Sequence, residues 1–176
     1  MRVFKFGGAS VKDAEGVINV VKVLTEMGYE DTLVVVSAMG KSTNAFEGVV
    51  DAYFENPDSC KAALHELEMF HQEIVETLFS GAHGPVAEQV KNLCAQCETF
   101  LANKRSPHRA FVYDQVVSFG ELLSTSIICA YLTHVGIAAE WVDARSCIKT
   151  DNCYRSAHLN WEQTQSAIQE QIQGNV

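Results

Sequence analysis

The chain has 176 residues, 47% of them hydrophobic, and its mean hydropathy is near zero. This length and composition are typical of one folded domain with a sizeable core, and they exclude a disordered, collagen-like or coiled-coil chain. Acidic residues outnumber basic ones by 22 to 13, and the resulting net charge of −9 argues against nucleic acid or an anionic membrane as the main partner.

The six cysteines indicate whether the protein works in an oxidising or a reducing cellular compartment. The chain is too large and too apolar to need disulfides, and it starts at Met1 without a signal peptide. We see no apolar run that approaches the ~20 residues needed to cross a bilayer. We therefore expect reduced thiols in a soluble, cytoplasmic protein with no membrane partner.

The first 38 residues predict a strand, a helix and a second strand. Residues 3–6 form a short apolar run ended by two glycines, and apolar residues then recur at helical spacing from about Ser10 to Gly28. Residues 33–36 are Leu-Val-Val-Val, which is typical of a strand buried on both faces. Strand, helix and strand together indicate a βαβ unit with a parallel sheet, and therefore an α/β fold.

The rest of the chain is predicted to be mainly helical. Two apolar stripes separated by glycines predict an antiparallel helical hairpin at about residues 58–103, within a single domain over residues 1–176. A third helix is expected at about 113–134, a strand at 137–142 and an amphipathic helix at 161–172.

The segment from Lys5 to Ser10 has the residue types of a phosphate-binding turn. Glycines allow the backbone to approach a phosphate, a helix N-terminus offers unpaired N–H groups, and a lysine supplies a full positive charge. The order differs from the Walker and Rossmann fingerprints. In the alternative interpretation, Gly7 and Gly8 only permit a tight bend and Lys5 points to solvent.

The segment from Ser37 to Asn44 follows the second strand, at the edge where ligands of open α/β sheets bind. Its hydroxyls, amide and lysine suit a small carboxylate. Thr43 or Asn44 can equally be an N-cap of the helix that begins near Ala45.

Two later segments, 118–124 and 143–151, contain charged residues next to apolar stretches. Glu121 interrupts the apolar segment 118–124 and could meet a cationic group such as a substrate ammonium, or it could lie on a solvated face or in the first turn of a helix. The segment 143–151 alternates in charge and could contact a ligand or pair its charges internally.

No metal-ligating residues are predicted. Cys94 and Cys97 have zinc or redox spacing, but both fall on the apolar stripe of a predicted helix, so small core residues are the better interpretation. His65 and His71 are six positions apart on a helix and so on different faces. The sequence shows no nucleophilic triad or Gly-x-Ser-x-Gly elbow.

Together these segments resemble the aspartokinases of the amino-acid kinase family. Lys5-Phe6-Gly7-Gly8-Ala9-Ser10-Val11 is similar to the family's K-F-G-G-T-S-V, and residues 34–44 to V-V-V-S-A-M-G-x-x-T-N. The segments around Glu121 and 143–151 resemble later family blocks in the same order. The resemblance implies an αβα sandwich around a mainly parallel sheet, with the hairpin as an insertion.

The resemblance also implies an activity, the transfer of the ATP γ-phosphoryl group to the side-chain carboxylate of L-aspartate. This is the first step of lysine, threonine and methionine biosynthesis. Lys5 would be catalytic, by stabilising the transferred group. The ATP phosphates would be lined by Lys5, Phe6, Gly7, Gly8 and Ser10. Aspartate would be held by Ser37, Thr43 and Glu121, with Glu121 on its ammonium. Mg²⁺ would accompany ATP, and the full-length protein would be a homo-oligomer.

Two departures from the family pattern matter. Ala9 replaces the usual threonine of the first motif. The 176 residues also end before the family's G-R-G-G-S-D-like and T-T-D-like blocks, so we expect an amino-terminal piece of a catalytic domain with no turnover of its own. A related kinase with another acceptor (glutamate, acetylglutamate, carbamate or a nucleotide) and a non-catalytic α/β binding module are the alternatives.

Overall fold

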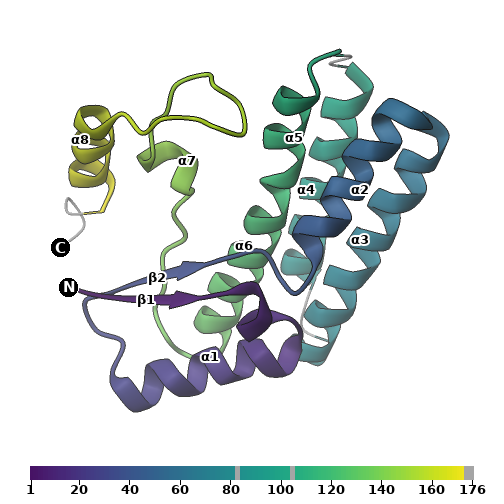
Figure 1. Ribbon diagram of the computed structural model, residues 1–176. Helices are drawn as coiled ribbons and strands as arrows, with labels where there is room; N and C mark the ends of the chain where they lie inside the picture. The colour runs from purple at the N-terminus through teal and green to yellow at the C-terminus, as the bar shows by residue number, and fades with distance from the viewer. Residues whose placement is uncertain (82–83, 104–105, 173–176) are drawn as a thin grey trace. The chain divides into compact units, whose positions relative to one another are not determined.

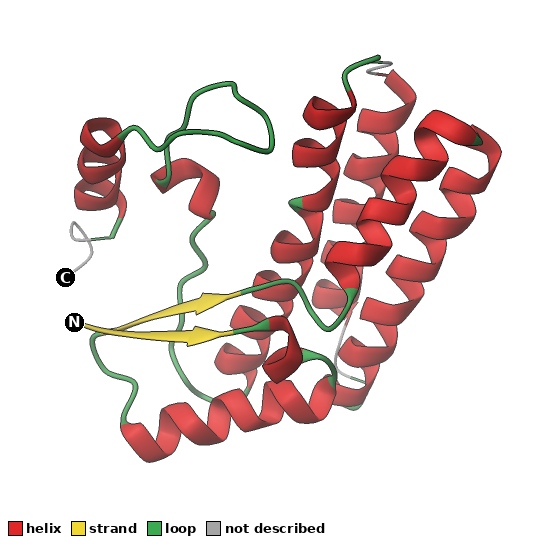
Figure 2. Ribbon diagram, viewed as in Figure 1, coloured by secondary structure: helices red, strands yellow, loops and turns green. Residues whose placement is uncertain are grey.

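The computed structural model describes residues 1–81, 84–103 and 106–172, and its chain divides into two compact units, Met1–Ala139 and Glu140–Val176 (Figures 1 and 2). In chain order, the first unit contains β1 (Arg2–Phe6), the 3-10 helix η1 (Gly8–Val11), α1 (Ala14–Met27), β2 (Thr32–Val36), α2 (Ser42–Glu55), α3 (Pro57–Phe79), α4 (Gly84–Asn103), α5 (Arg109–Val117) and α6 (Phe119–His134). The second unit contains α7 (Ala144–Cys147) and α8 (Trp161–Gln171).

The two strands confirm the predicted βαβ unit. β1 and β2 are parallel, paired in register from Arg2 opposite Thr32 to Phe6 opposite Val36, and α1 connects them. Because the strands run in the same direction, the loops that follow Phe6 and Val36 leave the sheet at the same edge.

The prediction that the second strand is buried on both faces is wrong. Phe4 and Val34 are partly buried against the core, whereas on the opposite face Val3 is 60% and Val35 is 44% exposed. Side chains alternate across a strand, so neighbouring residues face opposite sides. Among the described residues, the core of the first unit covers one face of this sheet and leaves the other accessible to solvent.

Helix α1 begins and ends at residues with clear capping roles. The Asp13 side chain accepts a hydrogen bond from the Gly16 N–H at 2.9 Å and caps the amino end. Gly28, with φ +78°, ends the helix in a conformation that favours glycine. Val17, Val20 and Leu24 are buried at helical spacing, so α1 packs one apolar stripe against the core.

The predicted helical hairpin is confirmed as α3 and α4, which pack against each other (Figure 1). Ser80 adopts a left-handed conformation, φ +46°, just after α3 ends. The stripes point inward at the buried positions Leu64, Leu67, Val90 and Leu101. The hairpin therefore supplies much of the core of the first unit, together with α2 and α6.

The single helix expected at 113–134 is two helices. The chain breaks at Ser118, whose hydroxyl donates to the Gln115 carbonyl at 2.9 Å, and the first of the two helices, α5, begins earlier, at Arg109. The stretch Arg109–His134 is long and apolar enough to cross a membrane by length and composition alone. Half of its most apolar window is buried, and its helices pack against α2, α3 and α4, as core helices do.

The strand expected at 137–142 is wrong, because this segment is an irregular loop. A strand needs a hydrogen-bonded neighbour, and the sheet of the described residues pairs β1 with β2 alone.

The expected helix at 161–172 is confirmed as α8, with Asn160 accepting the Gln163 N–H at its amino end. Before it, Thr150 and Leu159 form an antiparallel bridge that closes a loop in the second unit.

Candidate active site

The two loops that follow the strands lie side by side. The Ser37 N–H donates to the Phe6 carbonyl at 3.1 Å, and the Gly40 N–H donates to the Gly8 carbonyl at 3.0 Å. Both bonds join backbone atoms, so they fix the spacing of the loops directly. The predicted phosphate segment and the predicted carboxylate segment therefore form one continuous edge beyond the sheet.

Gly8 is required where these loops cross. A Cβ atom at Gly8 would lie 2.7 Å from the Ala38 carbonyl oxygen and 3.1 Å from the Gly40 carbonyl oxygen. Real Cβ atoms essentially never approach another atom as closely as 2.7 Å, and neither oxygen belongs to a flexible side chain. Gly40 itself has φ +53°, in the left-handed region that favours glycine.

Lys5 is exposed near the end of β1, and its ammonium group lies over the glycine turn. A Cβ atom at Gly7 would lie 3.3 Å from the Lys5 Nζ. The Gly7 carbonyl accepts the Ser10 N–H at 2.9 Å, which starts the 3-10 turn of η1. The glycine turn does bend tightly, as the alternative interpretation required, but the lysine lies beside it.

Ser10 does not stand at the start of α1, as the sequence had suggested. It is exposed within η1, and Asp13 occupies the N-cap of α1. A carboxylate at the N-cap already satisfies one of the unpaired N–H groups there and would repel an anion. An anion at this edge would therefore meet the turn around Gly7 and Gly8 and not the amino end of α1.

Glu121 joins the second loop from a distant part of the chain. It lies half-buried in the first turn of α6, and its Oε1 accepts the Ala38 N–H at 3.3 Å. The nearby Ser124 hydroxyl donates to the Ser37 carbonyl at 2.7 Å. Gly120 lets α6 approach closely, since a Cβ there would be 3.0 Å from the Ala38 Cβ.

Thr43 lies half-buried in the first turn of α2. The N-cap of this helix is Lys41, so the interpretation of Thr43 or Asn44 as the N-cap is wrong. Beside Thr43, the Ser42 hydroxyl is buried and has no hydrogen-bond partner among the residues that the structure describes. Thr43 therefore lies inside the helix and not in the loop before it, because α2 begins at Ser42 and not near Ala45 as expected.

In the charged segment 143–151 of the second unit, Asp143 pairs with Arg145 inside the segment, whereas Asp151 pairs with His158 outside it. The Arg145 guanidinium donates to the Asp143 carboxylate at 2.7 Å, and the Asp143 side chain also caps α7. These hydrogen bonds from Arg145 lower the pKa of the Asp143 carboxyl below its usual range.

Cys94 and Cys97 are buried core residues, as predicted. Burial raises the pKa of each thiol to about 12, so neither is ionised near neutral pH. All six cysteines are free thiols. His65 is exposed and His71 is fully buried, which confirms that they lie on different faces of α3.

Sequence reasoning missed two contributors to this site and the helix cap beside it. The Ala38 N–H, which holds Glu121, is a backbone group and carries no sequence signal. Ser124 stood in a segment of interest but had no visible partner. Asp13 could have been found, because an aspartate just before an apolar periodic segment is a typical helix start.

A cavity of about 640 Å³ opens elsewhere in the first unit, between α2, α3 and α4. Tyr53, Leu64 and Leu101 are among its lining residues, and none of the motif residues lines it. The motif residues Lys5, Gly8 and Glu121 lie instead on the segments that hydrogen bonds join at the loop edge.

Comparisons with known proteins find aspartokinases among the relatives of this chain. The chain is 32% identical to "Aspartokinase 3, chloroplastic" of Arabidopsis thaliana, over 98% of this chain and 31% of the relative. It is 27% identical to "Bifunctional aspartokinase/homoserine dehydrogenase 2" of Escherichia coli, over 85% of this chain and 18% of the relative. The chain thus spans about a third or less of the length of these relatives.

Solved structures show the same fold. Aspartokinase III of Escherichia coli, in complex with aspartate and ADP, superposes with a TM-score of 0.87 at 22% identity, over 99% of this chain and 38% of that chain. This likeness confirms the expected fold class, an amino-acid kinase sandwich seen in part. The model of the amino acid kinase family matches residues 1–176. With every residue of the chain inside that match, the chain belongs to the amino acid kinase family.

Proposed function

We propose that this chain carries the aspartate-binding and phosphate-facing part of an aspartate kinase, which transfers the ATP γ-phosphoryl group to the side-chain carboxylate of L-aspartate. The observation that carries the proposal is the convergence of Lys5, the glycine turn and Glu121 at one edge, joined by hydrogen bonds from three separate segments. The names of the relatives and the aspartate and ADP in the neighbouring structure support it.

The glycine turn and Lys5 form the phosphate side of the proposed site. Phosphoryl transfer needs positioning and charge neutralisation more than covalent help. The Lys5 ammonium beside Gly7 would neutralise charge on the transferred group, while Gly7, Gly8 and Ser10 would present N–H and hydroxyl donors. Phe6 closes the strand below this turn and its carbonyl anchors the second loop.

Ser37, Thr43 and Glu121 form the aspartate side. Glu121 accepts one N–H from Ala38, and a carboxylate has further lone pairs with which to hold the α-ammonium. An ammonium at this position also compensates a half-buried negative charge. Hydroxyl groups of Ser37 and Thr43 would orient the carboxylates of the substrate.

The reaction balances without a general base. An oxygen of the ionised aspartate side chain bonds to the γ-phosphorus, the bond from that phosphorus to the β-phosphate oxygen breaks, and ADP leaves. No proton has to be moved, because the nucleophile is already a carboxylate. The protein therefore has to align the two anions and offset their repulsion.

Magnesium in this proposal belongs with ATP. The three segments together contribute one carboxylate, Glu121, and it is already bonded to the Ala38 N–H. They do not form a magnesium site by themselves, and we derive no step through the ion. Magnesium in kinases is commonly held by substrate phosphates, water and one or two carboxylates.

The cytoplasm would suit this enzyme, because reducing conditions there keep all six free thiols reduced. Assembly into a homo-oligomer remains a prediction for the full-length protein.

The full-length encoded protein should form an acyl phosphate that hydroxylamine traps, dependent on both ATP and L-aspartate. Lys5→Ala should lower kcat by about 10²–10³. The matched control is Lys22→Ala, which removes an exposed lysine of α1 that pairs with Glu26. An undiminished rate in Lys5→Ala would overturn the role of Lys5.

A second arm tests the acceptor. Glu121→Gln should raise the KM for aspartate at least about tenfold, since a charge-assisted bond is lost, while Glu26→Gln should leave it unchanged. Calorimetry of the 176-residue chain with aspartate should show binding that Glu121→Gln abolishes. Turnover with glutamate and not aspartate would identify a different acceptor, and no specific binding would favour a non-catalytic module.

A further inference from the structure

We propose that Asp151, Cys153 and His158 form a binding site for one divalent transition-metal ion, zinc above all, on the closed loop of the second unit. The carboxylate oxygen, the thiol sulfur and the ring nitrogen of these three residues all lie within 4.8 Å of one another. All three side chains are exposed, so an ion can reach them from solvent.

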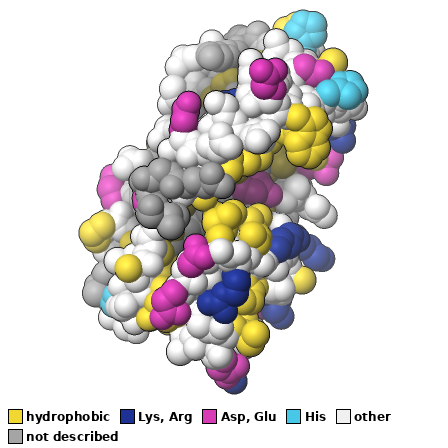
Figure 3. All heavy atoms as spheres, turned by 90° about the vertical axis from the view of Figure 1, so that its left-hand side faces the viewer, with side chains coloured by type: hydrophobic (Ala, Val, Ile, Leu, Met, Phe, Trp, Pro, Cys, Tyr) yellow, Lys and Arg dark blue, Asp and Glu magenta, His cyan; other side chains and the backbone are white. Residues whose placement is uncertain are grey.

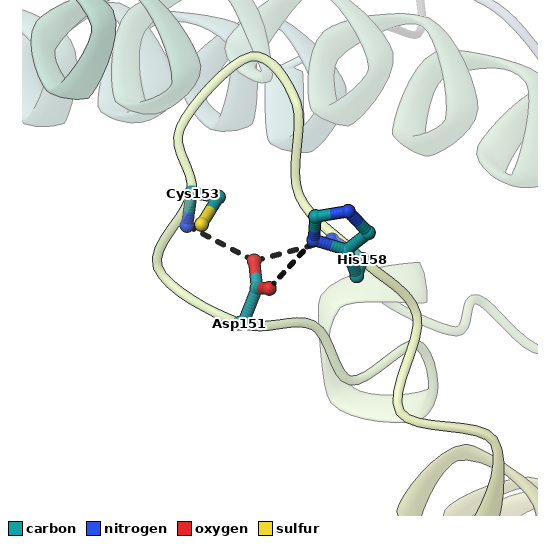
Figure 4. A group of neighbouring side chains, drawn as sticks. All are labelled: Asp151, Cys153 and His158. Atoms are coloured by element: carbon teal, nitrogen blue, oxygen red, sulfur yellow. Dashed lines mark hydrogen bonds and ion pairs between the residues drawn. The ribbon is translucent and has the colours of Figure 1, made fainter.

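The loop holds its ligands in place before any ion binds. Thr150 bridges Leu159 across its base, and the Asp151 N–H donates to the His158 carbonyl at 3.1 Å. Asp151 Oδ1 accepts the N–H groups of Cys153 at 3.0 Å and His158 at 3.1 Å. Figure 4 shows the carboxylate of Asp151 between the two arms that carry Cys153 and His158.

The donor set matches a borderline-soft cation. Zinc binds thiolate, imidazole and carboxylate groups, in tetrahedral sites where three protein ligands leave a fourth position for water. Magnesium and calcium prefer oxygen ligands alone, so the sulfur and nitrogen argue against them. The chain's net charge of −9 also attracts a cation.

The distances need only a small adjustment. His158 Nδ1 lies 2.9 Å from Asp151 Oδ2, and these two atoms would stand about 3.3 Å apart on a tetrahedral zinc with bonds of about 2.0–2.1 Å. The sulfur would lie about 3.6 Å from the nitrogen. Rotation of the exposed Cys153 side chain can supply that approach.

The protons of the three ligands can be followed through metal binding. Hydrogen bonds from the Cys153 N–H and the His158 ring lower the pKa of the Asp151 carboxyl to about 2, so the carboxylate is already ionised. His158 Nδ1 donates to that carboxylate and therefore carries hydrogen. On metal binding this hydrogen moves to Nε2 through solvent, the Cys153 thiol releases its proton, and one proton leaves for each ion bound.

The thiol of Cys153 can be distinguished from the others by experiment. Cys60, Cys94, Cys97 and Cys147 are buried, and burial raises the pKa of the first three. Cys129 is partly exposed, which makes it a matched control for substitution. His65, exposed on α3, is the matching control for His158.

The reduced 176-residue chain should bind one zinc ion per molecule in calorimetry with zinc chloride. Cobalt(II) in its place should give a thiolate-to-metal charge-transfer band. Cys153→Ser and His158→Gln should each weaken zinc binding at least about tenfold, the loss that even a supporting residue outside the ligand set can cause. Cys129→Ser and His65→Gln should leave affinity and stoichiometry unchanged.

Two results would overturn the proposal: no saturable zinc binding, or an unchanged affinity in Cys153→Ser. The serine variant keeps the backbone N–H that holds Asp151, so loss of binding there cannot be a loss of the loop. Asp151→Asn keeps the oxygen that accepts both N–H groups, and it should lose affinity while retaining its circular dichroism spectrum.

Discussion

Gly8 shows how one missing methyl group permits the site. The carbonyl oxygens of Ala38 and Gly40 occupy the space where its side chain would lie. Both oxygens belong to backbone that is hydrogen-bonded to other segments, so they cannot move aside without disturbing the loop pair. Gly48, inside α2, has nothing within 4 Å of the equivalent position and provides a contrast.

Gly8→Ala should lower the free energy of unfolding by about 1–3 kcal/mol, as overpacking does, because backbone has to shift. Gly48→Ala should raise it by about 0.5–1 kcal/mol, since alanine favours a helix interior. Urea denaturation of both variants checks this. Equal effects would show that the crossing has room to relax.

His71 is the second residue with a distinct physical role. It is fully buried in α3, with Nδ1 at 2.7 Å from the Leu67 carbonyl and Nε2 without a hydrogen-bond partner in the described part of the chain. Burial lowers the pKa of its imidazole, and the Leu67 hydrogen bond opposes this only in part. The folded protein therefore keeps the ring neutral.

This predicts a loss of stability on acidification. The unfolded chain protonates His71 near pH 6.5, while the folded protein does so only at lower pH. The stabilisation is fully present above about pH 6.5 and is lost as pH falls towards the lowered pKa. The thermal midpoint should therefore fall less between pH 7 and 5.5 in His71→Leu than in the parent. His65→Gln should keep the parental slope, and a parental slope in His71→Leu would refute the assignment.

At the scale of elements, the start of α6 organises the second loop. Glu121 accepts the Ala38 N–H, Ser124 donates to the Ser37 carbonyl, and Gly120 allows the close approach of helix and loop. The helix thus holds the loop by three contacts within its first two turns. Its break from α5 at Ser118 sets where those turns begin.

Two serines of α6 allow the contact between helix and loop to be tested separately from hydrogen bonds within the helix. Ser124→Ala should lower the free energy of unfolding by about 1 kcal/mol, because the partly buried Ser37 carbonyl loses its donor. Ser126 is equally buried but donates to Leu123 of its own helix, so Ser126→Ala should be neutral or stabilising by about 0.5 kcal/mol. Thermal unfolding of the pair measures the difference. Equal losses would mean that the loop contact adds nothing.

At the scale of the whole molecule, one face of the sheet carries exposed side chains. Val3, Lys5 and Val35 share this face, and all three are exposed. Figure 3 shows hydrophobic side chains at the surface among lysines, arginines and acidic residues. Exposed apolar groups beside a strand edge favour association between copies.

The double variant Val3→Thr and Val35→Thr should reduce concentration-dependent self-association, because it replaces apolar methyl groups with hydroxyls and keeps the strand propensity. Ile18→Thr changes an equally exposed residue of α1 and should have no such effect. Sedimentation velocity over a range of concentrations compares the three proteins. Unchanged association in the double variant would exclude this face as its cause.

Local pattern predicted much of this molecule. The strands, α1, the hairpin and α8 follow from apolar periodicity and helix stop signals, and the loops after both strands follow from the βαβ order. The predictions that were wrong depended on contacts with residues distant in the sequence. The segment 137–142 has strand composition but no described partner strand, and the first-turn position of Ser10 was excluded by the Asp13 cap. The contact of Glu121 with Ala38 joins residues 83 positions apart, which no spacing reveals.

The bond between Gly40 and Gly8 has a consequence for how such sequences can diverge. It joins backbone atoms, so the distance between the two loops does not depend on which side chains the neighbouring residues carry. Ala9, exposed in η1 where the family pattern has threonine, can therefore change without altering the geometry on either side. Substitutions should therefore be tolerated at Ala9 but not at Gly8. A comparison of related sequences should find a variable position directly beside an invariant glycine.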